Sequence, residues 1–477
     1  MYLGLDLGTS GVKALLVDAS QTEIAVGHGP LTVQRPHPLW SEQDPLSWIS
    51  ACESAIGQVR EQAPKEFAAL RGIAVSGQMH GATLLDGDDR PLRSAILWND
   101  GRAQAECAEL EARADFRGIG GNIVMAGFTA PKLRWVDKNE PEIFAKTRKV
   151  LLPKDFVNLW LTGEYVSEMS DAAGTLWLDV AKRDWSDALL AATGLTRDHM
   201  PRLVEGNQAA GTLRGELAQS WGVGNVTVAG GAGDNAATAC GLGIVKPGDG
   251  FLSLGTSGVL FSVTDRFASN TDGAVHSFCH AVPNTWHQMG VILSATDALS
   301  WLSQITGQKP ADLAALVPNN PAQPSPITFL PYLSGERTPH NAPDATGSFL
   351  GLRRAHGLPD MVQAVMQGVA FAFADCCAAL DQCGSLPDTV WVAGGGSQSE
   401  AWLQIIASAT GLTLKIPQSG AQGAALGAAR LAMLATDDAN SQDVLNVPKA
   451  EKTIHAAQQS QQLYAGCYQT FKDAWTN

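Results

Sequence analysis

The stretch LDLGTSGV occupies residues 5–12, and the stretch LSLGTSGV occupies residues 252–259. Seven of the eight positions agree, and the difference is Asp6 in the first copy against Ser253 in the second. A Gly-Thr-Ser-Gly turn between two apolar strands directs several backbone N–H groups into the turn and places two hydroxyls beside them, an arrangement that binds anions. Two unrelated β-hairpins could share such a turn, since Gly and Ser are common at turns. Matching apolar strands on both sides favour a duplication instead.

The segments around the two turns follow one order. The first copy predicts strands over 2–6, 12–18 and 23–33, a helix over 44–59 that Asp44 and Pro45 open, and a returning strand over 72–75. The second copy predicts strands over 250–255, 258–263 and 274–280, helices over 293–305 and 359–380, and a returning strand over 388–396. The sequence therefore predicts a duplicated α/β domain with a cleft between the copies.

The break between the copies is expected near 241–247, which gives an N-terminal domain over 1–243 and a C-terminal domain over 244–477. Residues between about 81 and 226 have no counterpart in the second half. We expect this insertion to set substrate specificity.

The difference between Asp6 and Ser253 at the one unmatched position of the two turns suggests a metal ion. Two anion-binding turns on opposing domains could hold different phosphates of one nucleoside triphosphate. A Mg²⁺ ion that bridges those phosphates needs a carboxylate, usually through water, and one is enough. Asp6 would serve the metal, while Ser253 adds no second negative charge.

Composition excludes several classes of protein. The net charge of −14 argues against a nucleic-acid-binding surface, which needs a basic face. We find no apolar run of about 18 residues that could span a membrane. The eight cysteines are scattered without metal-ligand spacing, and Cys376 and Cys377 are expected to pack in a core. No signal peptide precedes the first strand, and we expect a cytoplasmic protein.

Five stretches in this order resemble the FGGY carbohydrate kinases, which belong to the sugar kinase, actin and Hsp70 fold group. DLGTSG (6–11) and SLGTSG (253–258) resemble the two phosphate loops, and WVAGGGSQSE (391–400) resembles the adenosine loop. The two long family signatures are matched by GFTAPKLRWVDKN (127–139) and GSFLGLRRAHGLPDMVQAVMQ (347–367). The resemblance covers essentially the whole chain.

The resemblance implies a fold and a reaction. It implies duplicated actin-like ATPase domains, of ribonuclease H-like topology, flanking a central cleft, with ATP and Mg²⁺ as cofactors. Within the family, the members that phosphorylate D-xylulose are most similar, through SGQMHGATLLD (76–86), AILWNDGR (95–102), AGDNAA (232–237) and LPYLSGERTPHN (330–341). A homodimer is also in keeping with the family. One departure is Ala232, where the resemblance leads us to expect glycine.

The resemblance assigns the chemistry to two carboxylates. Asp234 would accept the proton of the sugar's primary hydroxyl as that oxygen attacks the γ-phosphoryl group. The alternative for Asp234 is a helix N-cap. Asp6 would bind the metal, usually through water; the alternative role for Asp6 is that of a turn residue. Lys13 faces either a phosphate or solvent.

The sugar contacts follow from the same resemblance. His80 would bind a sugar oxygen, and Met79 would contribute its backbone or an apolar wall. The alternatives are a structural histidine and a core methionine. Asn235 and Trp98 would complete the pocket, since aromatic faces pack on sugar C–H surfaces. Arg337 is assigned either to this pocket or to a surface turn.

The nucleotide would be bound by three short loops. Their expected contacts are Gly8, Thr9, Ser10 and Lys13 in the first, Gly255, Thr256 and Ser257 in the second, and Gly394, Gly395 and Ser397 in the third.

Three other functions were weighed. A kinase for a different ketose or polyol needs only small pocket changes. A non-catalytic sugar sensor on the same fold would be favoured by loss of Asp6 or Asp234, yet both are present. A chaperone-type ATPase would need a β-rich domain after the nucleotide core, whereas the chain beyond about residue 435 predicts only one further helical segment.

Overall fold

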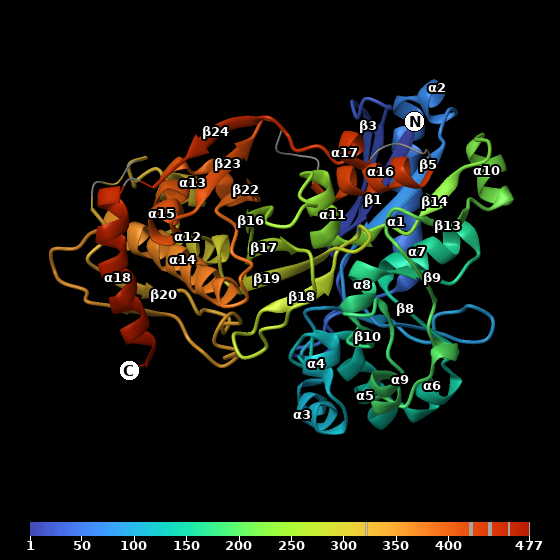
Figure 1. Ribbon diagram of the computed structural model, residues 1–477, viewed down its shortest axis with the longest axis horizontal. Coiled ribbons are helices and arrows are strands. Elements are labelled where there is room, and N and C mark those ends of the chain that lie inside the picture. Colours follow the sequence, from blue (N-terminus) through green and yellow to red (C-terminus); the bar gives the residue numbers. More distant parts are fainter. Residues whose placement is uncertain (320, 322, 419–422, 437–440, 457, 477) are drawn as a thin grey trace. The chain divides into compact units, whose positions relative to one another are not determined.

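The computed structural model describes residues 1–477 except 320, 322, 419–422, 437–440, 457 and 477. The chain forms two compact units (Figure 1). The first consists of Met1–Val245, Phe278–Trp286 and Ala421–Val447, and the second of Lys246–Ser277, His287–Gly420 and Pro448–Asn477.

The first unit is built on a seven-stranded sheet with the order β13-β14-β5-β1-β2-β3, to which β15 adds by pairing with β5. These strands are β1 Tyr2–Leu7, β2 Gly11–Val17, β3 Glu23–Pro30, β5 Gly72–Gly77, β13 Ala209–Thr212, β14 Thr227–Ala229 and β15 Ala232–Gly233. The meander predicted for the first copy is confirmed, since β1 pairs antiparallel with β2 and β2 with β3. Strand β5 returns parallel to β1, as the predicted helix between them requires.

Some helices of the first unit pack on this sheet, and others belong to the insertion. Asp44 caps the first of them by accepting a hydrogen bond from the Leu46 amide, as its sequence predicts. The helices are α1 Pro45–Gln62, α2 Pro64–Phe67, α3 Gln104–Arg113, α4 Phe116–Gly120, α5 Thr129–Asn139, α6 Pro141–Lys146, α7 Pro153–Thr162, α8 Met169–Ala173, α9 Asp187–Ala192, α10 Gly215–Trp221, α11 Asp234–Gly241, α16 Gly423–Thr436 and α17 Ser441–Val444.

The insertion adds short strands and one 3₁₀ turn to this unit. The strands form two-stranded sheets, with the pairs β4–β7, β6–β8, β9–β12 and β10–β11. Their bounds are β4 Glu42–Gln43, β6 Thr83–Leu85, β7 Ala95–Ile96, β8 Lys149–Leu151, β9 Val166–Glu168, β10 Leu178–Asp179, β11 Asp184–Trp185 and β12 Arg202–Val204, with the 3₁₀ turn at Arg197–His199.

The second unit repeats the plan around a sheet of order β18-β19-β17-β16-β22-β23-β24. Its elements are β16 Gly250–Leu254, β17 Gly258–Thr264, β18 His276–Cys279, β19 Trp286–Ile292, α12 Thr296–Thr306, α13 Pro310–Ala314, β20 Thr328–Leu330, β21 Ser348–Leu350, α14 Leu358–Asp381, β22 Thr389–Ala393, a 3₁₀ turn at Gly395–Gln398, α15 Glu400–Thr410, β23 Thr413–Pro417, β24 Ala450–Ile454 and α18 Gln458–Thr476. Strand β16 pairs antiparallel with β17 and parallel with β22, as β1 does with β2 and β5.

One predicted strand of the second copy lies at a different place in the sheet. The segment 274–280 was expected to be the third strand of the meander, but β18 lies at the sheet edge and β19 occupies the third position. Strand β19 was missed because WHQMGVI lacks a strict alternation of polar and apolar residues and is buried over nearly its whole length.

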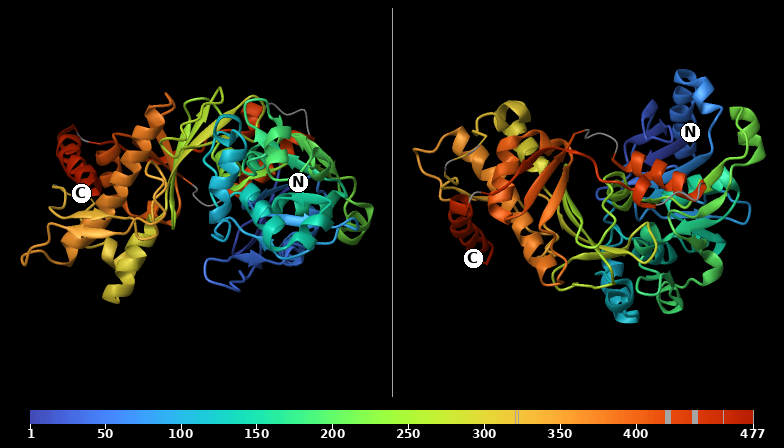
Figure 2. Two further views of the ribbon diagram at one scale, coloured as in Figure 1. Left: turned by 90° about the horizontal axis from the view of Figure 1, so that it is seen from below. Right: turned by 45° about the horizontal axis from the view of Figure 1, so that its top comes forward.

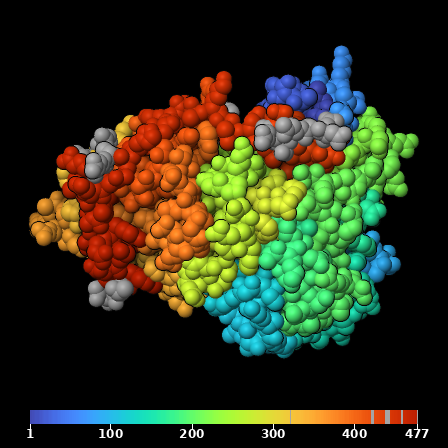
Figure 3. All heavy atoms as spheres, viewed as in Figure 1, coloured from blue at the N-terminus to red at the C-terminus, as the bar shows by residue number. Residues whose placement is uncertain are grey.

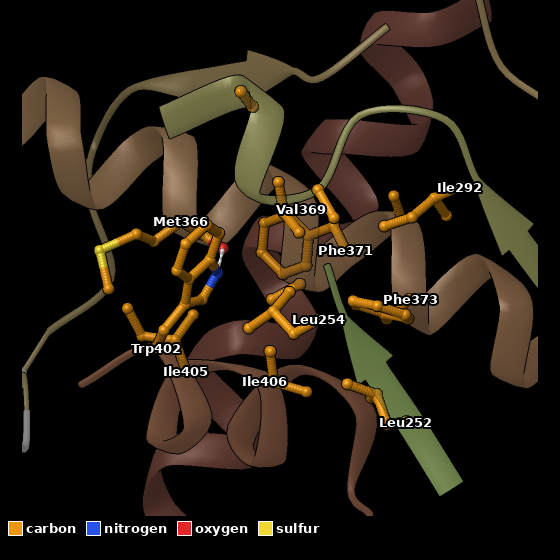
Figure 4. Close-up of a cluster of buried hydrophobic side chains, with 14 of the residues drawn as sticks. Leu252, Leu254, Ile292, Met366, Val369, Phe371, Phe373, Trp402, Ile405 and Ile406 are labelled. Atoms are coloured by element: carbon orange, nitrogen blue, oxygen red, sulfur yellow. Dashed lines mark hydrogen bonds between the residues drawn. The ribbon is translucent and has the colours of Figure 1, made fainter. Parts of the chain in front are cut away.

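The core of the second unit is formed around α14. Leu252 and Leu254 of β16 meet Phe371 and Phe373 of α14 and Ile406 of α15, and the Trp402 indole donates to the Met366 carbonyl oxygen at 3.0 Å (Figure 4). Cys376 and Cys377 are buried there, as predicted. By length and composition α14 could span a membrane, which corrects our expectation that no such run exists. However, 83% of its apolar window is buried, and we therefore assign it to the core.

The sequence predicts one boundary between the two domains, at residues 243 and 244. The observed units are not divided at one point, because α16 belongs to the first unit. Figure 1 labels α16 next to β1 and β5, and the right view of Figure 2 and Figure 3 show the red segment that contains it beside the blue N-terminal segment. A side-chain carbon on Gly4 would lie 1.9 Å from the Ala425 carbonyl oxygen, and one on Gly427 would lie 1.8 Å from that of Ala237. Glycine thus lets α16 approach both β1 and α11. Sequence periodicity gave no indication of this return.

Candidate active site

Three parallel strand ends bring the predicted acidic residues to one edge of the first sheet. Asp6 of β1 lies opposite Ser76 of β5, and Ser76 lies opposite Ala232 of β15. The Ser76 hydroxyl donates to Asp6 Oδ1 at 3.1 Å. Asp234 follows β15 directly, at the level where β5 continues into Gln78. The carboxyl ends of parallel strands thus place Asp6 and Asp234 at the same edge, which is where α/β sheets usually bind ligands.

Asp234 does not cap the helix that it begins. The N-cap residue of α11 is Gly233, and Asp234 is the first helical residue. Its carboxylate accepts hydrogen bonds from the Asn235 amide at 2.7 Å and from Asn235 Nδ2 at 3.0 Å. The N-cap alternative is therefore wrong. Asn235 thus orients the Asp234 carboxylate, and its predicted contact with the substrate stays a prediction.

Burial and charge make Asp234 a weaker acid than an exposed aspartate. Burial raises the pKa of Asp234 to about 6, and the negative charge of Asp6 adds to the rise. Burial also raises the pKa of Asp6, while Ser76 and the charge of Lys13 oppose the change. A carboxylate with a pKa near the working pH is suited to general base catalysis.

The residues around Asp6 fit a Mg²⁺ ion that is held mainly by a ligand. The described residues include no group of three or more His, Cys, Asp or Glu side chains that could enclose a metal. Mg²⁺ keeps most of its water and often uses one or two carboxylates together with substrate phosphates. One accessible carboxylate beside a phosphate loop therefore suffices.

Met79 and His80 lie next to the predicted base. A side-chain carbon on Gly233 would lie 3.1 Å from Met79 Cγ, so the methionine packs directly against the residue before Asp234. His80 has a φ of 69°, in the left-handed region that a non-glycine residue seldom adopts. Its Nδ1 lies 2.6 Å from the Gly174 carbonyl oxygen. Because a carbonyl only accepts, Nδ1 carries a proton and donates it to this oxygen.

The strained conformation of His80 is held by residues that sequence reasoning missed. The His80 carbonyl oxygen accepts from Thr129 Oγ1 at 3.2 Å and from Lys132 Nζ at 2.8 Å. Lys132 is fully buried and also donates to the Gly127 carbonyl oxygen at 2.7 Å. Burial lowers the pKa of Lys132 well below its usual range. These residues lie in or beside the first family signature, so the signal was present but carried no assigned role.

A buried charged group lies behind the base and was also missed. Lys154 Nζ lies 2.7 Å from Asp155 Oδ1 and 3.8 Å from carboxylate oxygens of both Glu168 and Asp171. Burial opposes the charge of Lys154, but the three carboxylates outweigh it and raise its pKa. Burial raises the pKa of Asp171 far above its usual range, which favours its neutral form. The Gly233 amide donates to Ser170 Oγ at 3.1 Å, which connects this group to the residue before Asp234.

The first phosphate loop contains the predicted residues Gly8, Thr9 and Ser10. The Gly8 amide donates to the Gly11 carbonyl oxygen at 2.9 Å and closes the turn. Trp98, whose exposed fraction is 44%, donates from Nε1 to Thr9 Oγ1 at 3.0 Å. Lys13 lies opposite Asp6 in the β1–β2 register. The packing of Trp98 against the sugar and the binding of a phosphate by Lys13 stay predictions.

The second phosphate loop and the predicted adenosine loop meet within the second unit. The Gly255 carbonyl oxygen accepts from Thr296 N at 2.9 Å, and that of Thr256 accepts from Ala295 N at 2.8 Å. Gly394 has a φ of 90°, and a side-chain carbon there would lie 2.6 Å from the Leu254 carbonyl oxygen. Only glycine permits this approach.

A cavity of about 400 Å³ opens beside the adenosine loop. Its walls come from the end of β22, the start of α15 and strands β23 and β24, with the residues Val392, Ala393, Gly394, Ser397, Gln398, Glu400, Ile416, Pro417, Gln418, Glu451 and Lys452. Ser397 Oγ donates to the Gly394 carbonyl oxygen at 2.7 Å and stabilises the turn. Lys452 and Glu400 form an ion pair at 2.6 Å at its rim. The predicted residues Gly394 and Ser397 thus line this cavity, and Gly395 and Ser257 lie in the two adjoining turns.

Arg337 is half-buried in the second unit, and its predicted contact with the sugar stays a prediction. Its Nη1 lies 3.2 Å from His276 Nε2, and burial lowers the pKa of its guanidinium. Ala232 is fully buried in a small cluster that includes Ala74, Ala229 and Ala236. Its methyl group is therefore part of the core.

Comparison with known proteins identifies the class of protein that this fold and site define. The model of the FGGY family of carbohydrate kinases, N-terminal domain, matches residues 1–241, and that of the C-terminal domain matches residues 250–436. The chain therefore belongs to the FGGY family of carbohydrate kinases and is a sugar phosphotransferase.

Several relatives are more specific. The xylulose kinase of Escherichia coli (strain K12) is 51% identical over 444 residues, which cover 92% of this chain and 91% of that protein. The crystal structure of a xyloylose kinase from Brucella ovis has 54% identity and a TM-score of 0.98, covering 100% of this chain and 98% of the other. The xylulose kinase of Rhodospirillum rubrum has 29% identity and a TM-score of 0.92 over 100% and 98% of the two chains.

Proposed function

We propose that the chain transfers the γ-phosphoryl group of ATP to the primary hydroxyl of D-xylulose, giving D-xylulose 5-phosphate. The position of Asp234 carries the proposal. This carboxylate begins α11 at the sheet edge, packs through Gly233 against Met79, and has a pKa raised to about 6. Relatives at 51% and 50% identity are xylulose kinases, which supports the choice of sugar.

The residues of the first unit would orient the sugar. His80 Nε2, with the proton fixed on Nδ1, accepts a hydrogen bond from a sugar hydroxyl. Met79 forms an apolar wall beside Gly233. The primary hydroxyl then faces the Asp234 carboxylate, which Asn235 holds in place by two hydrogen bonds.

Asp234 would remove the proton of that hydroxyl late in the transfer. The oxygen forms a bond to the γ-phosphorus, the bond from phosphorus to the β,γ-bridging oxygen breaks, ADP leaves, and the proton passes to Asp234. Phosphoryl transfer has a loose transition state, so alignment and charge stabilisation supply most of the acceleration and the base supplies less. Mg²⁺, when bound beside Asp6 through water, would neutralise phosphate charge.

The nucleotide would use both Gly-Thr-Ser-Gly loops and the cavity beside Gly394. Backbone N–H groups of the loops suit phosphate oxygens. The cavity of about 400 Å³ is of a size that suits adenine and ribose. An ATP-dependent reaction also agrees with a cytoplasmic location, and we expect the protein there as a monomer or homodimer.

A panel of acceptors tests the proposal. The ratio kcat/KM would be measured with Mg-ATP and D-xylulose, D-ribulose, L-xylulose, L-ribulose, xylitol, glycerol and D-gluconate. We expect the highest value for D-xylulose. A higher value for another ketose or polyol would replace the substrate and keep the reaction, whereas ADP release that no acceptor stimulates would overturn the proposal.

A further inference from the structure

A closed ring of three hydrogen bonds joins the first phosphate loop to the strand that carries the sugar-binding pair. Thr9 Oγ1 donates to Gln78 Oε1 at 3.0 Å. Gln78 Nε2 donates to Gln43 Oε1 at 2.9 Å, and Gln43 Nε2 donates to the Thr9 carbonyl oxygen at 2.7 Å. Gln78 directly precedes Met79 and His80, so the ring connects the first phosphate loop to the proposed sugar contacts.

The two glutamines of the ring are buried, and the ring accepts an indole N–H on each of two sides. The exposed fraction of Gln43 is 0% and that of Gln78 is 3%. On the core side, the buried Trp48 donates from Nε1 to Gln43 Oε1 at 3.0 Å. On the solvent side, Trp98 Nε1 donates to Thr9 Oγ1. Indole N–H groups only donate, so these two contacts fix which atoms of the ring accept and which donate.

The second copy of the turn is held in another way. Its carbonyl oxygens at Gly255 and Thr256 accept backbone N–H groups from Ala295, Thr296 and Asp297 at the start of α12. That loop is therefore attached to a helix through its main chain. The first loop is attached through side chains to the strand end that carries Met79 and His80. The first loop is therefore connected directly to the residue before Met79 and His80.

We infer that Gln78 is a positioning residue that fixes the first phosphate loop relative to the sugar-binding pair, through Thr9. The inference rests on the proposed kinase function and deepens it. The Thr9 hydroxyl donates its proton to Gln78, so its side chain aligns the loop. The backbone amides of the loop would then bind the phosphate. Phosphoryl transfer depends strongly on alignment of attacking oxygen and phosphorus, so loosening the ring lowers kcat more than it weakens binding.

A double-mutant cycle measures the connection. Thr9→Val removes the hydroxyl while keeping the side-chain shape, and Gln78→Met removes the amide while keeping its length. Thr9→Val leaves the buried Gln78 Oε1 without its donor, and Gln78→Met removes the acceptor of the Thr9 hydroxyl proton. We expect each change to lower kcat about tenfold. The KM values for ATP and sugar should change less than about threefold. The double variant should lose little beyond either single variant, because both break one ring.

Two further variants separate positioning from stability. Thr9→Ser keeps the hydroxyl and should restore most of kcat. Thr83→Val is the matched control: Thr83 is fully buried in β6, its hydroxyl has no hydrogen-bond partner among the described residues, and it lies outside the ring. We expect this control to leave kcat unchanged. Losses that multiply in the double variant, or a Thr9→Ser variant as slow as Thr9→Val, would overturn the inference.

Hydrogen exchange of the loop amides gives a readout that needs no sugar turnover. Peptides over 7–12 and 254–259 report the two loops in the same molecule. Gln78→Met should speed exchange in the first about tenfold and leave the second unchanged. Unchanged exchange in the first loop would contradict the positioning role. A wild-type protein that phosphorylates no sugar would refute the proposed function, and the exchange result would still decide the connection.

Discussion

Asp6 and Asp234 place two carboxylates at one edge of the first sheet, and the charge of Asp6 makes Asp234 harder to ionise. Two nearby carboxylates in a buried site usually titrate as a pair. One of them then has a pKa close to the working pH. Under the proposed function, Asp234 would be a base of useful strength and Asp6 would supply the negative charge for the metal.

The pH dependence of kcat/KM follows from the pKa of Asp234. The base must be ionised, so we expect kcat/KM to be constant above about pH 7 and to fall tenfold for each pH unit below about 6. The Asp6→Asn variant loses a neighbouring negative charge, so its acid limb should move to lower pH. Rates measured from pH 4.5 to 8.5 test this. An acid limb near pH 4 in the wild type would contradict the raised pKa.

The same pKa predicts a stability effect with a definite sign. An unfolded aspartate has a pKa near 3.9, and the folded value is about 6, so the folded state binds the extra proton between these values. That contribution to stability is present at low pH and is lost as the pH rises through 6. Asparagine does not ionise, so Asp234→Asn avoids this loss of stability at higher pH. We expect the variant to be more stable than the wild type by up to about 3 kcal/mol at pH 7.

Thermal unfolding of Asp234→Asn and wild type at two pH values checks this effect. The variant should have the higher Tm at pH 7 and an equal Tm at pH 4. An inactive variant that is more stable is a common sign of a strained functional residue. A lower Tm at pH 7 would instead indicate that the Asp234 carboxylate supports the fold.

At the scale of elements, the turn after helix α8 packs against Met79 and His80, the proposed sugar contacts. A side-chain carbon on Gly174 would lie 2.7 Å from His80 Nδ1 and 2.8 Å from Met79 Cε. We expect Gly174→Ala to displace the imidazole and to raise the KM for sugar at least tenfold, with little change in the KM for ATP. Steady-state kinetics with each substrate varied in turn measures both values.

Gly57→Ala is the control for that substitution. Gly57 lies within α1, and a side-chain carbon there meets no atom within 4 Å. We expect unchanged kinetics and a slight gain in stability, because alanine favours a helix more than glycine does. An equal rise of sugar KM in both variants would show that the Gly174 effect is not local.

The predicted elements show where sequence reasoning reaches and where it stops. The meander, α1 and the return of β5 follow from alternation, capping and turn residues that lie within a few positions of one another. Strand β19 has no such alternation, because it is buried on both faces. The position of α16 against β1 depends on glycines far apart in the chain, which no local pattern reveals.

The site shows the same limit. Asp6, Met79, His80 and Asp234 were predicted from motifs, and the structure brings them to one edge of a sheet. The supporting residues Gln43, Thr129 and Lys132 were missed, because their roles depend on hydrogen bonds across long stretches of chain. Motifs indicate which residues react, and tertiary contacts decide what holds them.

At the scale of the whole molecule, the sugar contacts beside Asp234 and the adenosine loop lie in different units, while Arg337 is the predicted sugar residue that lies in the second unit. Met79, His80 and Asp234 belong to the first, and Gly394 and Ser397 belong to the second. Effects on the two substrates should therefore be separable. A side-chain carbon on Gly394 would lie 2.6 Å from the Leu254 carbonyl oxygen at a φ of 90°.

We expect Gly394→Ala to raise the KM for ATP at least tenfold and to leave the KM for D-xylulose within about threefold. Gly395, where a side-chain carbon meets no atom within 4 Å, provides the matched substitution. Gly395→Ala should have the smaller effect on ATP. Equal effects of both changes on both substrates would contradict the separation.

The most direct test of the central claim is ³¹P NMR of wild type and Asp234→Asn with Mg-ATP and D-xylulose. The account predicts that the wild-type γ-phosphate signal of ATP is replaced, one for one, by a sugar phosphomonoester signal and the β-phosphate signal of ADP. In Asp234→Asn the same change should be at least a hundredfold slower. Inorganic phosphate in place of the sugar phosphate, or equal rates in the two proteins, would contradict the account.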